Sequence, residues 1–414
     1  MVITPNNLPP KQFFSRYFGL TAAKIALLVG KSVILILAYG WLPTADFALL
    51  AGILSVIEIV RPVSDLGAEN IIYARLGNAQ RLLPRVIQKI LRLRLQVAGL
   101  ISLIGIVGLI GFGYVNVAPL FLLPLIVAGQ NTNLALLQKV HAYRNITVLT
   151  ITAFSTSVAS ILIAYWSQAD NLLLCLLLIS PEVVAGFVGI YLSRTSWKSL
   201  WSSSLKNKKS IKKLLPYMLP SIGIGVIVMI YSRLDVIYIR PVLGEQAQAD
   251  FSVAFRLVDP LFLILSLASL TLLAELGSNN SPDAKRISQT LFKKMRAKFY
   301  ILFFGVFCIL AFNLYYLSLY VFYFSSVAAN LLIVFILTIP IKLLNTFYSS
   351  LLQRAGKFNQ IFLAAMITLI CTFTFAIPFG MVYGVMGVAV AAALAELINM
   401  LYQKKIVQKN LGDL

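Results

Sequence analysis

Long apolar runs separated by short polar stretches dominate the pattern of hydrophobic and polar positions along the chain. An apolar run of about 20 residues can cross the hydrocarbon core of a bilayer as a helix. Twelve such runs can be drawn, with breaks near Asn116 and at Tyr383–Gly384, so the pattern predicts an all-α polytopic membrane protein. The predicted spans are 18–41, 46–65, 95–115, 117–138, 146–166, 171–192, 217–239, 250–273, 299–321, 327–350, 360–380 and 382–402.

The longest polar connection lies at the middle of the chain and divides the twelve spans into two sets of six. We expect an N-terminal six-helix half at 1–200, a cytoplasmic linker at 201–213 and a C-terminal six-helix half at 214–414. Short segments recur in the same order in both halves, for example Ala45-Asp46-Phe47 as Ala249-Asp250-Phe251. An internal duplication with an even number of spans gives two halves of the same orientation.

The composition supports a membrane protein and argues against other classes. Hydrophobic residues make up 59% of the chain and charged residues 12%, against roughly 25% charged in a soluble domain. The net charge of +21 lies in loops between apolar runs, so no nucleic-acid partner is expected. The 3 cysteines lie inside apolar runs without paired spacing, which argues against a disulfide framework or a metal site.

Lysine and arginine set the expected orientation, because short cytoplasmic loops carry the excess of these residues. Most of the 35 Lys and Arg fall in one alternating set of loops, whereas the opposite loops hold only Arg240. Both termini are therefore expected in the cytoplasm. Between spans 2 and 3, Arg81, Arg85, Lys89 and Arg92 recur at helical spacing, which fits either a topology anchor or the recruitment of an anionic lipid headgroup.

Two stretches carry a resemblance to a known family. The first has Asp235 near the end of an apolar run, then Leu243-Gly244, then an aromatic-x-x-Ala-x-Arg-Leu sequence from Phe251 to Leu257. The second runs from Val63 to Gly77. Both resemble the Wzx-type polysaccharide flippases of the MOP superfamily, which includes the MATE transporters.

This resemblance implies two six-helix bundles around a central cationic cleft lined by spans 1, 2, 7 and 8. It implies a flippase in the bacterial cytoplasmic (inner) membrane that translocates undecaprenyl-pyrophosphate-linked oligosaccharide for O-antigen, capsule or exopolysaccharide assembly. Membrane lipids and the polysaccharide polymerase or ligase machinery are the other implied partners. No cofactor is expected, and coupling to a proton or sodium gradient is expected.

Basic residues inside the spans are the candidates for binding an anionic headgroup, because a charge in the hydrocarbon layer costs about 2.5 to 3.5 kcal/mol and usually faces a wet cavity. Lys24 and Lys31 share one helix face and have no acidic residue in their own span, although Lys24 can also snorkel to the headgroups. Arg61 has Glu58 and Asp65 on its own helix face, so its charge is either neutralised locally or functional.

The other basic candidates lie in later spans. Arg233 and Asp235 are two apart and are expected on different sides of one helix, which leaves Arg233 to face a ligand. Arg256 and Asp259 are three apart and are expected to pair. The predicted substrate-binding residues are thus Lys24, Lys31, Arg61, Arg233, Arg256 and Lys342, the last of which follows Pro340 in mid-span.

Acidic residues inside the spans are the candidates for ion coupling. Glu182 follows Pro181, and Glu396 lies in an alanine-rich run. Each fits either a protonatable coupling site or a hydrogen bond between closely packed helices. Asp235 and Asp259 are the next candidates.

Two other functions compete with the flippase. A MATE-type multidrug or cation antiporter needs acidic residues for cationic drugs, whereas the predicted cleft spans are rich in Lys and Arg. An integral-membrane sugar polymerase or ligase usually presents a sizeable external loop, whereas the external loops here are short. The sequence therefore favours a transporter over an enzyme.

Overall fold

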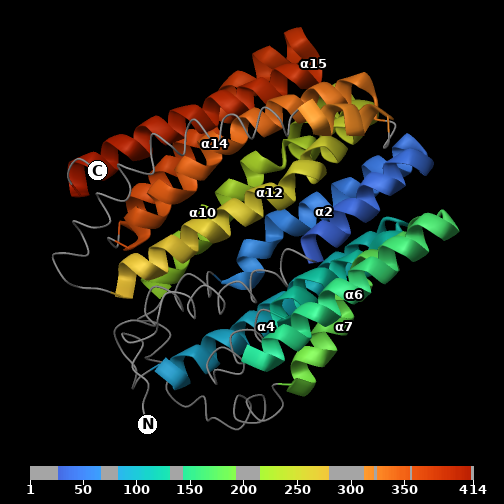
Figure 1. Ribbon diagram of the computed structural model, residues 1–414, viewed down its shortest axis with the longest axis horizontal. Coiled ribbons are helices and arrows are strands. Elements are labelled where there is room, and N and C mark those ends of the chain that lie inside the picture. The colour runs from blue at the N-terminus through green and yellow to red at the C-terminus, as the bar shows by residue number, and fades with distance from the viewer. Residues whose placement is uncertain are drawn as a thin grey trace. The chain divides into compact units, whose positions relative to one another are not determined.

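The computed structural model describes residues 27–66, 83–130, 143–192, 215–278, 312–320, 324–354 and 357–411, and every regular element in these ranges is helical (Figure 1). Six helical segments are long and apolar enough to cross a membrane, and a seventh candidate is a broken pair, Ile222–Ser232 with Asp235–Leu243. The six are Thr44–Asp65, Arg92–Gly111, Thr147–Ser167, Asn171–Leu192, Ser326–Leu352 and Phe358–Lys409. The all-α membrane fold class is confirmed. The count of twelve spans is confirmed only in part, since predicted spans 18–41, 117–138 and 299–321 lie partly outside the described residues.

The described residues form two compact units, one within 15–236 and the other within 237–414. We call them the N-terminal unit and the C-terminal unit. The break between them falls after Val236. The predicted linker at 201–213 lies outside the described residues, so the division into halves 1–200 and 214–414 stays a prediction.

The N-terminal unit packs α6 on α7, α10 on α2, and η2 on both α4 and α7. The bounds of its elements are Leu27–Trp41 for the first apolar helix, α2 Thr44–Asp65, α4 Leu83–Gly111, η2 Val115–Leu122, α6 Tyr143–Ser167, α7 Asn171–Leu192 and α10 Leu215–Ser232. α7 begins where predicted because Asp170 caps it, its Oδ1 accepting a hydrogen bond from the backbone N–H of Leu173 at 2.9 Å.

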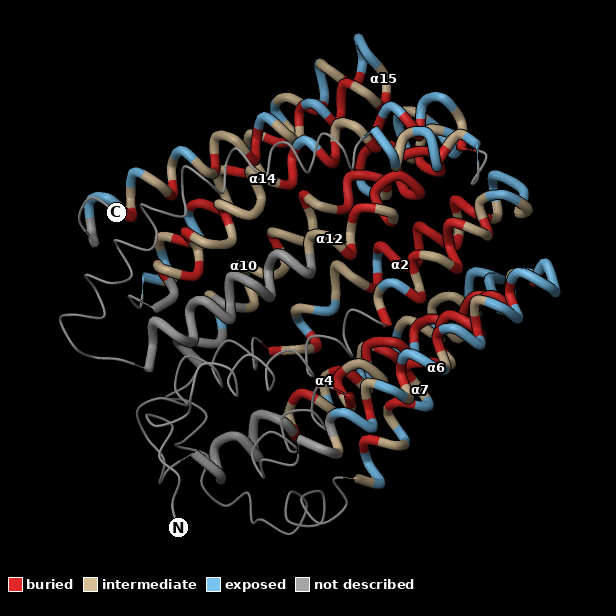
Figure 2. The backbone as a smooth tube through the Cα atoms, viewed as in Figure 1, coloured by how far each residue is buried: buried red, intermediate tan, exposed pale blue. Residues whose placement is uncertain are grey.

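Membrane helices differ from soluble ones in what they expose, and α6 shows the difference. Its exposed residues include Ile151, Phe154, Val158 and Leu162, which recur every three or four positions, while Ala153 and Ala164 are buried. Figure 2 shows this split between the buried and exposed sides of the helices. A continuous exposed apolar stripe suits contact with lipid tails rather than water.

The structure refines two predicted boundaries. α4 begins at Leu83, so the basic segment after Leu83 is continuous with the predicted span 95–115, whose apolar part long enough to cross a membrane is Arg92–Gly111. The break predicted near Asn116 lies instead at Phe112–Tyr114, and Asn116 is part of the 3-10 helix η2. The sequence does not predict this change from an α-helix to a 3-10 helix, because both helix types bury similar apolar side chains.

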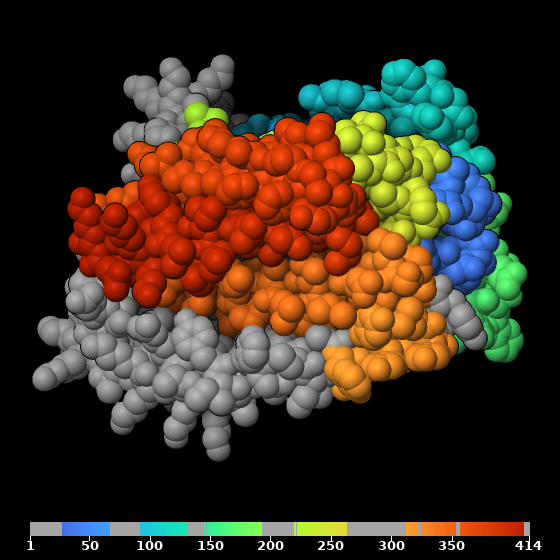
Figure 3. Space-filling model, turned by 90° about the horizontal axis from the view of Figure 1, so that it is seen from above, coloured from blue at the N-terminus to red at the C-terminus, as the bar shows by residue number. Residues whose placement is uncertain are grey.

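The C-terminal unit is built around α14, which packs against both α12 and α15. Its elements are α11 Arg240–Leu243, α12 Glu245–Ser278, α14 Ser326–Arg354 and α15 Phe358–Leu411. Figure 3 shows α14 and α15 side by side on one face of this unit. Ser325 caps α14, because its Oγ accepts the backbone N–H of Ala328 at 3.0 Å and donates to Asp250 at 2.8 Å.

The predicted break at Tyr383–Gly384 is a sharp turn inside α15. Gly384 has φ +59° and ψ −145°, a conformation outside the helical region that glycine adopts without strain. Three residues later, a Cβ on Gly387 would overlap the carbonyl oxygen of Phe379. In a straight helix these two residues would lie about 12 Å apart. The chain therefore reverses, and predicted spans 11 and 12 form a tight helical hairpin.

We expect Gly387→Ala to destabilise the protein, because the added methyl group has no space beside the Phe379 carbonyl. Overpacking of this kind costs about 1 to 3 kcal/mol. Gly108→Ala is the matched control, since a Cβ there meets nothing within 4 Å. Thermal unfolding in detergent should show a lower midpoint for Gly387→Ala alone. Equal midpoints for the two variants would contradict the hairpin.

Candidate functional site

The first polar cluster in the N-terminal unit joins Lys31 of the helix Leu27–Trp41 to Glu182 of α7 by an ion pair. The helices approach closely here, because a Cβ on Gly30 would lie only 2.6 Å from Cβ of Ser157 on α6. Gln130 Nε2 donates to the backbone oxygen of Glu182 at 2.6 Å. The sequence showed no acidic residue in the same span as Lys31, and the structure adds a partner on another helix. The predicted role of Lys31 in substrate binding stays a prediction.

Pro181 interrupts the backbone hydrogen bonds of α7 next to Glu182. Proline lacks the N–H that would bond the carbonyl of Leu177, and the ring disturbs the helix at that point. The hydroxyl of Ser180 donates to this carbonyl at 3.2 Å and contacts Ser160 of α6 at 2.9 Å. The backbone is thereby satisfied within the unit, as a membrane helix requires. Glu182 itself is buried, and its Oε2 has no hydrogen-bond partner among the described residues.

The second cluster lies where α10 ends. α10 stops at Ser232, and the π-helix η3 runs from Asp235 to Ile239, so the predicted continuous span 217–239 is broken. Arg233 forms an ion pair with Glu58 of α2, and the hydroxyl of Ser55 donates to Asp235 Oδ2 at 2.9 Å. Both charged residues therefore reach the same face of α2. The expectation that they point to different sides is wrong, because it assumed a regular α-helix.

Arg61 of α2 is exposed and forms no ion pair with the described residues. Its two expected partners on the same helix are engaged elsewhere: Glu58 pairs with Arg233, and Asp65 pairs with the buried Arg94 of α4. The predicted local neutralisation of Arg61 is therefore wrong. Because both carboxylates of α2 pair with arginines outside this helix, Arg61 is left exposed.

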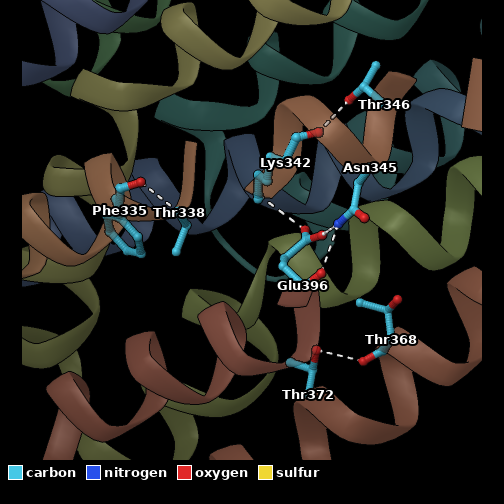
Figure 4. Close-up of polar contacts among 8 residues, drawn as sticks. All are labelled: Phe335, Thr338, Lys342, Asn345, Thr346, Thr368, Thr372 and Glu396. Atoms are coloured by element: carbon cyan, nitrogen blue, oxygen red, sulfur yellow. Dashed lines mark hydrogen bonds and ion pairs between the residues drawn. The ribbon is translucent and has the colours of Figure 1, made fainter. Parts of the chain in front are cut away.

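The C-terminal unit has its own cluster of polar groups between α14 and α15, shown in Figure 4. Lys342 Nζ lies 3.7 Å from Glu396 Oε1, and Asn345 Nδ2 donates to Glu396 Oε2 at 2.6 Å and to the Glu396 backbone oxygen at 3.0 Å. Lys342 Nζ also lies 4.3 Å from the ring centre of Phe262 of α12. Glu396 thus makes the helix–helix hydrogen bond that was one of its two predicted roles.

The remaining predicted residues divide into one confirmed pair and one residue that is outside the described ranges. Arg256 and Asp259 pair along α12 as expected, with Nη1 and Oδ2 4.0 Å apart. Lys24 lies outside the described residues. The sequence reasoning missed Gln130, Asn345, Ser55 and Arg94, whose only signal is a polar residue within or beside an apolar run.

Comparisons with known proteins identify the fold. No family model matches the chain, and no curated protein matches it. Solved structures do match over nearly the whole chain. An inward-facing multidrug resistance MATE-family transporter of the MOP superfamily has TM-score 0.70 at 13% identity, covering 94% of this chain and 98% of its own. An outward-facing one has TM-score 0.69 at 13% identity, covering 98% and 97%.

A third match is a MOP-superfamily transporter from Pyrococcus furiosus, described as having a binding pocket of reverse polarity that suggests a different function. Its TM-score is 0.68 at 13% identity, with 97% of this chain and 95% of the other covered. Such a low identity carries information on the fold alone. This chain therefore has the fold of the MATE-like transporters of the MOP superfamily.

Proposed function

We propose that this protein is a flippase that translocates polyprenyl-pyrophosphate-linked oligosaccharide repeat units across the bacterial cytoplasmic membrane by alternating access. The repeat units would serve O-antigen, capsule or exopolysaccharide assembly. The fold supports a transporter, because similar solved structures include both inward-facing and outward-facing states. In this proposal both termini lie in the cytoplasm, and the protein moves its substrate without chemical change.

The single observation that carries the choice of an anionic substrate is the state of Arg61. An exposed guanidinium within an apolar helix is costly unless a partner or water meets it. The carboxylates that could neutralise it on α2 are held by Arg233 and Arg94. A pyrophosphate, which accepts paired hydrogen bonds from a guanidinium, has the chemistry of a partner that the described residues do not supply.

Deletion of the gene should make undecaprenyl-linked repeat units accumulate on the cytoplasmic side of the membrane. Extraction of lipid-linked intermediates, followed by mass spectrometry, measures the accumulation, and protease-free right-side-out vesicles treated with a glycosidase distinguish the two leaflets. Complementation with the intact gene is the control. Absence of accumulation in the deletion strain would refute the flippase proposal.

A MATE-type multidrug or cation antiporter is the second candidate. It is favoured by the similarity to a multidrug resistance MATE-family transporter and by the buried carboxylates of Glu182 and Glu396. This function predicts a lower minimum inhibitory concentration of cationic drugs in the deletion strain, with unchanged lipid-linked intermediates. The same two measurements therefore separate the candidates.

A further inference from the structure

Lys342 is held loosely between two partners in the C-terminal unit. Its Nζ lies 3.7 Å from Glu396 Oε1, beyond the usual 2.7 to 3.2 Å of a hydrogen bond, and 4.3 Å from the ring centre of Phe262. An ammonium near the face of an aromatic ring is attracted by the ring's quadrupole. The lysine can therefore move away from Glu396 while keeping favourable contact with α12.

The exposure of the two charged side chains is unequal. The side chain of Lys342 is 24% exposed, whereas that of Glu396 is 8% exposed. Lys342 is therefore the more accessible member of the pair, whereas Glu396 stays largely enclosed when the lysine leaves. A buried carboxylate without a cation favours its protonated, neutral form.

Asn345 adds a second reason for Glu396 to take up a proton. Its Nδ2 already donates to Glu396, but its Oδ1 is buried without a hydrogen-bond partner among the described residues (Figure 4). Buried polar atoms in folded proteins are nearly always hydrogen-bonded. A protonated Glu396 adds an O–H donor to this cluster, in addition to the N–H groups of Lys342.

We infer that Lys342 is exchanged between Glu396 and the anionic headgroup of the substrate, and that Glu396 takes a proton from the aqueous phase when the lysine leaves. The inference rests on the proposed function and names its coupling step. Protonation of Glu396 releases Lys342 for the anion, and by linkage the bound anion favours protonation of Glu396. One proton accompanies each headgroup bound at this position, with no net loss of charge pairing.

The other ionisable groups on the packed elements do not interrupt this exchange. On α12, Arg256 and Asp259 face each other at 4.0 Å, and Asp250 accepts hydrogen bonds from Gln246 and Ser325. On α11, Arg240 pairs with Glu245 at 3.2 Å. On α15, Lys404, Lys405 and Lys409 follow Glu396 by two or more helical turns. Lys342 is the cation placed at Glu396 by the described contacts.

The test uses the full-length protein in detergent and geranyl pyrophosphate, a soluble prenyl pyrophosphate, with uncharged geraniol as the ligand control. Titration calorimetry in two buffers of different ionisation enthalpy counts the protons taken up on binding. The wild-type protein should bind more tightly at pH 6 than at pH 8 and take up a proton that Glu396→Gln does not. Ionisation of the ligand is common to both proteins and cancels in the difference.

Each variant has its own expected result. Glu396→Gln, which mimics the protonated carboxyl, should bind about tenfold more tightly than wild type at pH 8, because Lys342 is already released. Lys342→Met should weaken binding at least tenfold at both pH values. Ser349→Ala removes a neutral hydrogen bond to Gln403 across the same helices and should leave the pH dependence unchanged.

The outcomes separate this inference from the proposed function. If the wild type does not bind geranyl pyrophosphate at either pH, the proposed function fails and this inference with it. If the wild type binds and Glu396→Gln shows the same proton uptake, the coupling step alone is overturned. If Glu396→Gln does not fold, the wild-type measurement in the two buffers is sufficient. Proton uptake by the wild-type complex that is no greater than the proton uptake of geranyl pyrophosphate itself would overturn the exchange.

Discussion

Replacement of Arg233 by methionine is expected to remove most of the protein from the membrane. Arg233 is 5% exposed and pairs with Glu58 of α2, and removal of one partner of a buried pair costs about 3 to 5 kcal/mol. Typical stabilities are about 5 to 15 kcal/mol, so this loss is large. Immunoblots of membrane fractions and melting temperatures in detergent measure it.

Two further variants test whether the loss of protein comes from breaking the Arg233–Glu58 pair. The double variant Arg233→Met/Glu58→Met removes both charges and should recover much of the lost protein, because neither member of the pair is left without the other. Arg240→Met removes a cation whose pair with Glu245 is more exposed, with side chains 32% and 46% exposed, and should cost at most about 1 kcal/mol. A normal level of inactive Arg233→Met protein would instead support the headgroup role that the sequence suggested for this residue.

The helices were largely predictable because hydrophobic runs and helix signals are local. The span predicted at 171–192 coincides with α7, and the break at Tyr383–Gly384 is the turn of the α15 hairpin. The break at Arg233 was not predictable in the same way. Arg233 stands between Ser232 and Leu234 with no glycine or proline beside it, and the short π-helix Asp235–Ile239 that follows has no hydrophobic period of its own.

The partners of the charged residues were the least predictable part of the candidate site. Sequence spacing finds neighbours on one helix, and it found Arg256–Asp259 correctly. The pairs Lys31–Glu182 and Arg233–Glu58 join helices far apart in the chain, and no spacing rule reaches them. These two ion pairs give Lys31 and Arg233 a structural reason to lie inside the protein. Whether they also contact a headgroup stays a prediction.

Arg61→Ala should leave the protein in the membrane at its normal level but prevent it from restoring surface polysaccharide in a deletion strain. The folding expectation follows from the exposure of Arg61 and from the absence of an ion pair with any described residue. Loss of one charge-assisted contact of about 1.5 kcal/mol weakens headgroup affinity roughly tenfold. Calorimetry with geranyl pyrophosphate measures this affinity directly.

Arg61→Lys should keep part of the affinity, because lysine retains the charge but loses the paired hydrogen bonds of the guanidinium. Val63→Ala, at an exposed apolar position of the same helix, should bind like wild type. The pattern expected is therefore full affinity for Val63→Ala, partial affinity for Arg61→Lys and the lowest for Arg61→Ala. Equal affinity in all three variants would remove Arg61 from the site, and with it the observation that favours an anionic substrate over a cationic drug.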